Sequence, residues 1–214
     1  MVAYYTMKPR QLSIPDARRF LVSYHFAPTT AQGVFARLGS VQFDPLKPVG
    51  RNPDLVLQAR VEAYRVDDWA KLAYQERFII DAWDKQASLV LTEDWPRRRI
   101  YHTWHQSRWR ERVLDTFPEA IAAVLAELQE RGPLTSAAFA YQEHKDEWRD
   151  SWYGPRLTKN VLRALWHTGK VLTHSRKHGH HVYDLAERII PPSLHAATPY
   201  SAHDSTEWLI TLRH

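Results

Sequence analysis

The spacing of apolar residues divides the first half of the chain into segments of two kinds. Apolar positions three and four residues apart, typical of helices packed on one side, recur over residues 13–26, 29–39, 54–64 and 65–75. Short, mostly apolar runs typical of strands lie at 41–44, 77–83 and 87–92. Two helices, a strand, two helices and paired strands are the order of a winged helix-turn-helix. We therefore expect such a domain over residues 1–95, with its wing near 77–92 and with Asp54 capping the third helix.

The second half repeats this order after a helical connector. Residues 118–132 have the spacing of a helix that Gly132 ends, and residues 133–142 are predicted to form a short second helix. A polar insertion, a helix and a hairpin that turns at 177–179 follow. The predicted fold class is α+β, mainly α with small β-hairpins, arranged as tandem winged helix-turn-helix domains. The predicted boundaries are 96–115 for the connector, 116–192 for the second domain and 193–214 for a tail or the start of a further domain.

Two polar residues stand one position apart on the first predicted strand. Alternation along a strand places Gln42 and Asp44 on one face and Val41 and Phe43 on the other. Asp44 precedes Pro45, which favours an extended conformation at Asp44 and ends the strand or places it at a sheet edge. The pair is either solvent-facing decoration or a site that holds one water molecule, and the pattern alone favours decoration.

Composition narrows the class of protein. With 44% hydrophobic and 25% charged residues, the 214-residue chain is able to build a core. A net charge of +5 favours a polyanionic partner. The absence of cysteine excludes disulfides, thiolate catalysis and thiolate zinc sites. Neither a signal-peptide core nor an apolar run of roughly 18 residues occurs, so we expect a soluble, intracellular protein.

The second predicted domain carries the clearest cationic surface. Arg156, Lys159 and Arg163 share one face of a predicted helix. Residues 154–181 contain six Lys or Arg, five His and no acidic residue. A basic helix followed by a basic hairpin suits duplex binding, because the helix enters the major groove and the hairpin reaches phosphates. The hairpin residues that we expect to contact DNA are Arg176, Lys177, His178 and His180. The alternative is a solvated cationic face.

Other candidate sites are weaker. The spacing of His174, His178, His180 and His181 does not match a zinc site, so no metal is expected. The arginines and aromatic residues of the connector suit either a grip on a nucleic-acid backbone or packing between domains. Arg51 and Asn52 form a polar loop that suits a phosphate contact or a plain turn. Neither a glycine-rich phosphate loop of the Walker or Rossmann type nor a nucleophile-elbow serine is present.

Three blocks of the chain resemble the crosslink-repair DNA glycosylase family of winged-helix proteins, the YcaQ/AlkZ type. The blocks, which occur in the family's order, are "LGSVQFDPLKPVGRNPDLVLQAR", "DAWDKQASLVLTEDWPRRR" and "GKVLTHSRKHGHHVYDLAERIIP". The first contains the family's glutamine–apolar–aspartate or glutamine–apolar–glutamine motif, here Gln42–Phe43–Asp44. The resemblance implies a glycosylase that hydrolyses the N-glycosidic bond of alkylated or crosslinked purines, with tandem winged helices around double-stranded DNA.

On this resemblance Gln42 and Asp44 form the catalytic pair, and no cofactor is implied. Alkylation at purine N7 makes the base cationic and a good leaving group, so little acid catalysis is expected. The sugar becomes oxocarbenium-like as the bond breaks. A carboxylate at Asp44 suits stabilising that charge and taking a proton from water, while the Gln42 amide orients the water. Lys47 raises the alternative of a Schiff-base lyase, which is disfavoured because Lys47 lies outside the motif.

Members of this family are usually longer, with a third winged helix and a β-barrel, so we expect this chain to be a truncated member. The expected partner is double-stranded DNA, with no membrane and no metal, and the expected state is a monomer in the bacterial cytoplasm or nucleoid. The alternative function is a winged-helix DNA-binding protein without catalysis, either regulatory or a truncated family member.

Overall fold

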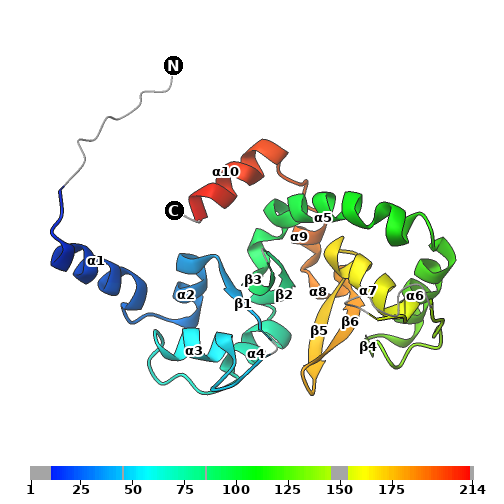
Figure 1. Ribbon diagram of the computed structural model, residues 1–214, viewed down its shortest axis with the longest axis horizontal. Coiled ribbons are helices and arrows are strands. Elements are labelled where there is room, and N and C mark those ends of the chain that lie inside the picture. Colours follow the sequence, from blue (N-terminus) through cyan, green and yellow to red (C-terminus); the bar gives the residue numbers. More distant parts are fainter. Residues whose placement is uncertain (1–10, 45, 85, 146–153, 213–214) are drawn as a thin grey trace.

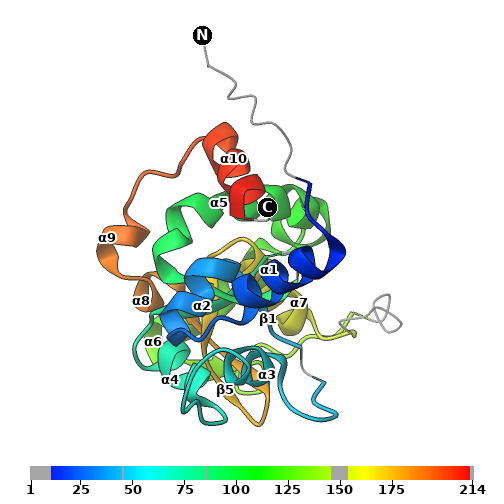
Figure 2. The ribbon, with the colours of Figure 1, turned by 90° about the vertical axis from the view of Figure 1, so that its left-hand side faces the viewer.

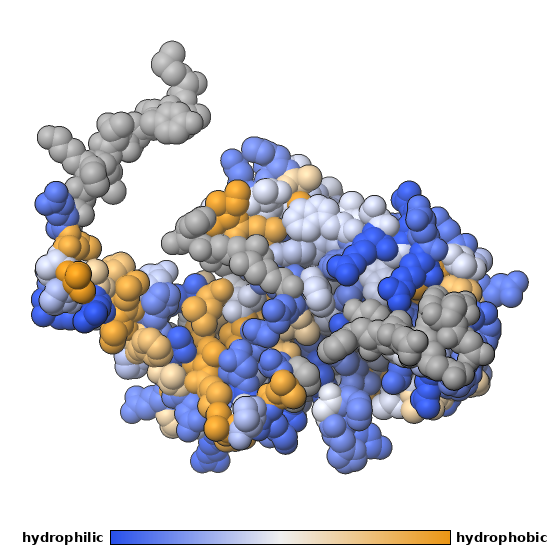
Figure 3. All heavy atoms as spheres, viewed as in Figure 1, coloured by the Kyte–Doolittle hydropathy of each residue, from blue (hydrophilic) through white to orange (hydrophobic). Residues whose placement is uncertain are grey.

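Two helices open the chain, and each begins at a capping residue. The computed structural model describes residues 11–44, 46–84, 86–145 and 154–212. Helix α1 (Ile14–Phe26) starts after Ser13, and α2 (Ala31–Leu38) starts after Thr30, whose hydroxyls accept hydrogen bonds from the third backbone N–H of each helix. Helix α1 has no buried residue and lies to one side of the molecule (Figure 1). Figure 3 shows an apolar surface along it.

The first half forms a three-stranded antiparallel sheet with helices packed on it. Strands β1 (Ser40–Gln42), β2 (Ile79–Trp83) and β3 (Ala87–Leu91) are ordered β1-β3-β2. Helices α3 (Asn52–Gln58) and α4 (Asp68–Tyr74) lie between β1 and β2 in the chain. The core of this unit includes the fully buried side chains of Val34, Phe35, Leu57, Ile79 and Leu89.

The prediction of a helix over 54–64 capped by Asp54 is wrong. Helix α3 ends at Gln58, and the Asp54 carboxylate instead accepts hydrogen bonds of 2.8 Å from the Tyr64 hydroxyl and the Asp67 N–H. The chain after Gln58 is held by contacts with the end of α1. The Arg60 guanidinium donates to the His25 carbonyl, and the Arg60 carbonyl accepts from the Thr29 N–H. These tertiary hydrogen bonds replace the ones that would continue the helix.

The connector is the helix α5 (Trp95–Trp109), preceded by the 3₁₀ turn η1 (Thr92–Asp94) and followed by the π-helical turn η2 (Arg110–Leu114). Several of its arginine and aromatic side chains point inward. Arg98 is buried and donates to the Gly39 carbonyl at 2.9 Å, and Tyr101 donates to Asp84 at 2.5 Å. The Trp109 indole donates to His167 at 2.7 Å. These residues pack the connector against both halves of the chain, whereas Trp104 is 51% exposed.

The second unit is built from α6 (Pro118–Arg131), β4 (Leu134–Thr135), α7 (Leu157–His167), β5 (Val171–Lys177) and β6 (His180–Leu185). Its sheet is ordered β4-β6-β5. The β5–β6 hairpin turns through His178 and Gly179, both at positive φ, as a two-residue hairpin turn requires. Much of the predicted polar insertion, residues 146–153, lies outside the described residues.

The short helix predicted over 133–142 is wrong. Leu134 and Thr135 pair with Tyr183 and Val182 as a strand, and the following residues form turns. The Glu127 carboxylate accepts hydrogen bonds from the Ala140 and Tyr141 N–H groups, which holds this turn against α6. The partner strand lies some 48 residues away along the chain, so local periodicity could not predict this pairing.

In both units a strand is followed by helical structure and then by a hairpin, with two helices (α3 and α4) in the first unit and one (α7) in the second. Both sheets have the same strand order, in which the first strand pairs with the third. The two units share a buried cluster that includes Ile80 and Val90 of the first unit and Leu172 and Ile190 of the second. Helices α8 (Ala186–Ile189), α9 (Pro192–His195) and α10 (Ala202–Leu212) follow, and Figure 2 shows α10 beside α5. Within the described ranges no helix is long and apolar enough to cross a membrane.

Candidate active site and nucleic-acid interface

The motif of Gln42, Phe43 and Asp44 lies at the end of β1 and has the predicted alternation. Gln42 is exposed, Phe43 is buried with 2% exposure, and Asp44 is half-buried. The Phe43 N–H donates to the Ala87 carbonyl at 2.8 Å, so pairing with β3 continues one residue past β1. The buried ring therefore fixes the backbone from which the two polar side chains project.

Each of the two polar side chains has one atom engaged in a hydrogen bond and, among the described residues, one oxygen that is free to accept another. The Gln42 Nε2 donates to Gln86 Oε1 at 2.6 Å, which leaves Gln42 Oε1 as an acceptor. The Asp44 Oδ1 accepts from the Leu46 N–H at 2.8 Å. Within the described ranges nothing hydrogen-bonds to Asp44 Oδ2. One acceptor on each of two residues that stand one position apart suits one water molecule, which has two protons to donate.

Gln86 is a residue that sequence reasoning missed. Its side-chain oxygen orients the Gln42 amide, although the two residues are 44 positions apart. The register of β1 on β3, in which Gln42 lies opposite Ser88, brings them together. The only available signal in the sequence was that Gln86 is polar and stands just before a predicted strand.

Arg51 and Asn52 lie beside the motif. The Asn52 Nδ2 donates to the Gln42 carbonyl at 2.8 Å, which ties the start of α3 to β1. The guanidinium carbon of Arg51 is 5.8 Å from the Phe43 ring centroid, within cation–π range. Contact of either residue with DNA stays a prediction, and the structure places both next to the predicted catalytic pair.

A groove of about 420 Å³ joins the motif strand to the second unit. Phe43 lines it together with Lys159 and Arg163 of α7 and with Arg176 and His180 of the hairpin. Of the motif only Phe43 lines this groove, and the alternation that buries Phe43 turns Gln42 and Asp44 away from this lining. A shared opening of the pair onto a cationic groove stays a prediction. The groove brings together four of the residues predicted to contact DNA.

The other predicted DNA contacts surround this groove at greater exposure. Arg156 is an exposed residue at the start of α7, on the helix face that carries Lys159, and it does not line the groove. Lys177 and His178 are exposed at the tip of the hairpin. Arg163 is half-buried, with its guanidinium carbon 5.4 Å from the Trp166 ring centroid. The cations thus form a surface that runs from α7 to the hairpin tip.

Arg176 differs from the others because its side chain is only 9% exposed. Its Nε donates to the fully buried carboxylate of Asp81 in β2 at 2.7 Å, and its Nη1 donates to the Gly179 carbonyl at 2.9 Å. Its Nη2 lies 3.2 Å from His181 Nε2. A DNA contact by Arg176 stays a prediction, and in this structure its guanidinium links the two units.

Burial lowers the pKa of His181 to about 4, so the ring is neutral at neutral pH. A guanidinium only donates, so His181 Nε2 accepts from Arg176, and the ring proton resides on Nδ1. That proton is donated to Thr173 Oγ1 at 2.8 Å. The described residues contain no group of three or more metal-binding side chains. His174 and His181 are engaged in hydrogen bonds within the hairpin.

His167 is a buried histidine with a strongly lowered pKa. Burial, and then the charge of Arg163, lowers its pKa to about 2. Below the unfolded value near 6.5 the unfolded chain binds a proton that the folded protein does not, so stability falls as the pH decreases. At pH 5 this one histidine should lower the free energy of unfolding by about 2 kcal/mol relative to pH 7.5. Urea titrations at both pH values measure the loss.

The matched variant is His167→Gln, whose side-chain oxygen accepts from the Trp109 indole as the imidazole does. Its unfolding free energy should change less between pH 7.5 and pH 5, by about the contribution of one proton. An equal pH dependence in the two proteins would show that His167 is not the group that resists protonation.

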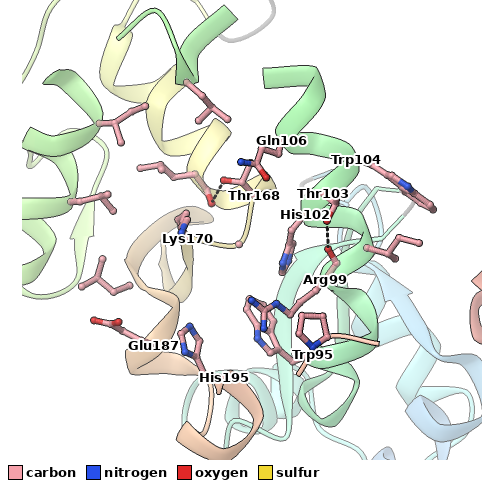
Figure 4. A pocket seen from close by; sticks show the side chains of 18 of the residues that line it. Trp95, Arg99, His102, Thr103, Trp104, Gln106, Thr168, Lys170, Glu187 and His195 are labelled. Atoms are coloured by element: carbon pink, nitrogen blue, oxygen red, sulfur yellow. Dashed lines mark hydrogen bonds between the residues drawn. The ribbon is translucent and has the colours of Figure 1, made fainter. Parts of the chain in front are cut away.

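A second cavity, of about 990 Å³, lies between α5, α6 and the turn from α7 to β5 (Figure 4). Its polar lining includes Arg99, His102 and Lys170, and its apolar lining includes Leu125 and Leu165. Neither Gln42 nor Asp44 lies in it. Leu165 is on the side of α7 opposite Arg163, since two residues along a helix turn by about 200°. This cavity therefore lies behind the cationic surface.

Gly169 forms part of the wall of this cavity and has φ +69. A Cβ at this position would overlap the His102 ring. Gly169→Ala should therefore lower the unfolding free energy by about 2–4 kcal/mol, through left-handed strain plus displacement of the ring. Gly179→Ala, at φ +84 with nothing near its Cβ, carries the strain alone and should cost about 1–2 kcal/mol. Equal losses in chemical denaturation would contradict the predicted clash.

Comparison with known proteins assigns the chain to a family. No solved structure matches it. A family model described as DNA glycosylase AlkZ-like matches residues 35–213. The match begins in α2 and takes in the Gln42–Phe43–Asp44 motif and all the residues that line the cationic groove. The chain therefore belongs to the AlkZ-like family of DNA glycosylases.

Proposed function

We propose that this protein is a DNA glycosylase that hydrolyses the N-glycosidic bond of alkylated or crosslinked purines in double-stranded DNA. The observation that carries the proposal is the position of the motif. Gln42 and Asp44 flank a buried phenylalanine that lines a groove with Lys159, Arg163 and Arg176. Family membership supports glycosidic hydrolysis in general, and the preference for cationic purines rests on the chemistry of the pair.

The proposed reaction needs one water molecule and no cofactor. The C1′–N9 bond breaks and its electron pair leaves with the N7-alkylated base, which is already cationic and needs no added proton. The water oxygen bonds to C1′ as positive charge develops on the sugar. Asp44 Oδ2 stabilises that charge and takes one water proton, while Gln42 Oε1 accepts a hydrogen bond from the other. The products are the free base and an abasic site.

Water rather than an amine is the proposed nucleophile, so the glycosylase is monofunctional. Lys47 is exposed in the loop beyond Asp44, and among the described residues no ion pair or hydrogen bond engages its side chain. A lysine that forms a Schiff base at neutral pH is normally desolvated or placed next to another cation. The half-buried carboxylate at the motif suits activation of water better.

For DNA binding we propose that the two units are winged helices. The shared strand order supports this, because the first strand of a unit pairs with the second strand of its hairpin. In the second unit α7 would enter the major groove with Arg156 and Lys159, and Lys177 and His178 would reach phosphates. The Arg51–Asn52 loop would contact the backbone beside the lesion.

The test is release of N7-methylguanine. Purified protein is incubated with a duplex that carries one N7-methylguanine, and abasic sites are then cleaved with alkali. We expect cleavage at the lesion and none in an unmodified duplex of the same sequence. Binding to the duplex without base release would instead identify a non-catalytic DNA-binding protein. A second duplex with an interstrand crosslink between purines shows whether crosslinks are also substrates.

A further inference from the structure

Phe43 is held by side chains from both units, which ties the predicted catalytic strand to the hairpin. On one side, the Trp69 ring of α4 meets its edge with centroids 5.2 Å apart. On the other, the guanidinium carbon of Arg176 in β5 lies 4.0 Å from its centroid. A guanidinium plane over an aromatic face is attractive, and more so when both groups are withdrawn from water. The ring between Gln42 and Asp44 is thus fixed by a residue more than 130 positions away.

Arg176 is itself held in place by the strands around it. The ion pair with Asp81 is almost fully buried, and Asp81 receives a second hydrogen bond, from the Tyr74 hydroxyl at 3.3 Å. The Asp81 carbonyl accepts from the Trp166 indole of α7 at 3.3 Å. A buried ion pair is costly to break by removing one partner, because the other charge is left unpaired. Arg176 therefore cannot leave Phe43 without disturbing both units.

The same guanidinium contacts the hairpin turn. Its Nη1 donates to the carbonyl of Gly179, next to the exposed His178 at the tip. The tip is where phosphates are proposed to bind, so its position and the position of Phe43 are set by one rigid group. A planar fork with several donors is able to make these contacts together, whereas an ammonium group is not.

We propose that Arg176 is a positioning residue for the hydrolysis rather than a DNA contact, an inference that rests on the proposed function. It joins the hairpin that engages DNA to the strand that carries Gln42 and Asp44, through Phe43 and Asp81. Its role is to hold the two side chains at the spacing that places water against the sugar. Small displacements of such a pair lower the rate of the chemical step while leaving binding intact.

The test separates the chemical step from binding with Arg176→Lys. Lysine keeps the charge beside Asp81 and loses the planar face on Phe43. With enzyme in saturating excess over the N7-methylguanine duplex, the rate of base release should fall about 10- to 100-fold. The Kd for the same duplex should stay within about threefold, because the net charge is unchanged. Arg19→Lys, on the exposed side of α1, is the matched control and should leave both quantities unchanged.

Phe43→Leu provides a second test that leaves the ion pair intact. It keeps an apolar side chain at the buried position and removes the aromatic face, so it should lower the same rate in the same direction. Thermal unfolding of each variant shows that the assays are run on folded protein. Should Arg176→Lys not fold, the outcome for Phe43→Leu decides.

Two results would overturn the inference alone. One is an unchanged rate at saturation in both variants. The other is a Kd of Arg176→Lys weakened well beyond threefold with an unchanged rate at saturation, which identifies Arg176 as a residue that binds DNA through its planar fork. Wild-type protein that binds the duplex and releases no base overturns the proposed function itself, and this inference with it.

Discussion

Asp44→Asn is expected to reduce the rate of N7-methylguanine release by about 10³-fold at saturating enzyme. Asparagine has nearly the same shape as aspartate and its oxygen is able to accept the Leu46 N–H as the carboxylate does. It supplies neither a negative charge for the developing cation at C1′ nor a base for the water proton. The measurement is single-turnover base release followed by alkaline cleavage of the abasic strand.

Binding should survive this change, because the substitution removes a negative charge beside a polyanion. We expect the Kd of Asp44→Asn for the lesion duplex to be equal to or lower than that of the wild type. Asp115→Asn makes the same chemical change at an exposed position after η2 and should leave the rate unchanged. Gln42→Ala should lower the rate less, by about 10-fold, because the variant no longer orients the water but keeps Asp44 as the general base. Full activity of Asp44→Asn would exclude the proposed mechanism.

Reversing the charge at both Arg156 and Lys159 is expected to weaken duplex binding by about 10²-fold near physiological salt. Both side chains are exposed on one face of α7, so the change should leave the core of the second unit intact. Each lost phosphate contact should lower the slope of log K against log salt by about one. The effect should be equal for duplexes of different sequence, because phosphates carry no sequence information. Fluorescence anisotropy at several salt concentrations measures both quantities.

The control carries the same change in net charge elsewhere. Arg18→Glu with Arg19→Glu alters two exposed arginines of α1, which lies apart from the cationic groove. Its affinity should fall far less, and its salt slope should not change. Arg163 is treated separately, as Arg163→Gln, because it is half-buried against Trp166 and reversal there would disturb packing. Equal losses in the two double variants would show that only overall charge attracts DNA, and not the face of α7.

Elements whose signals are local could be predicted from the sequence. The caps at Ser13 and Thr30 are satisfied within one turn of their own helices, so their neighbours in the chain decide them. The same holds for Gly39, which ends α2 at positive φ, and for the two-residue turn at His178 and Gly179. Alternation at the end of β1 likewise predicted a buried Phe43 between the more exposed Gln42 and Asp44.

Elements that depend on distant partners could not be predicted. Residues 59–64 leave the helical path because Arg60 is bound by the end of α1, and Leu134 joins a sheet because β6 offers it a pairing edge. In the connector, the inward packing of Tyr101 and Trp109 was decided by Asp84 and His167, which are buried partners from other elements. Side-chain periodicity predicts which face of an element is apolar, but it does not predict which other element that face packs against.

The sequence by itself determined the basic helix and hairpin, the alternation of the Gln42–Phe43–Asp44 strand and the family to which the chain belongs, because these reside in residue types and short spacings. Only the tertiary structure decided that Gln86 orients Gln42 and that Arg176 turns inward onto Asp81 and Phe43. Those pairings join residues 44, 95 and more than 130 positions apart. Their energy arises from burial and strand register, which exist only once the two units are packed together.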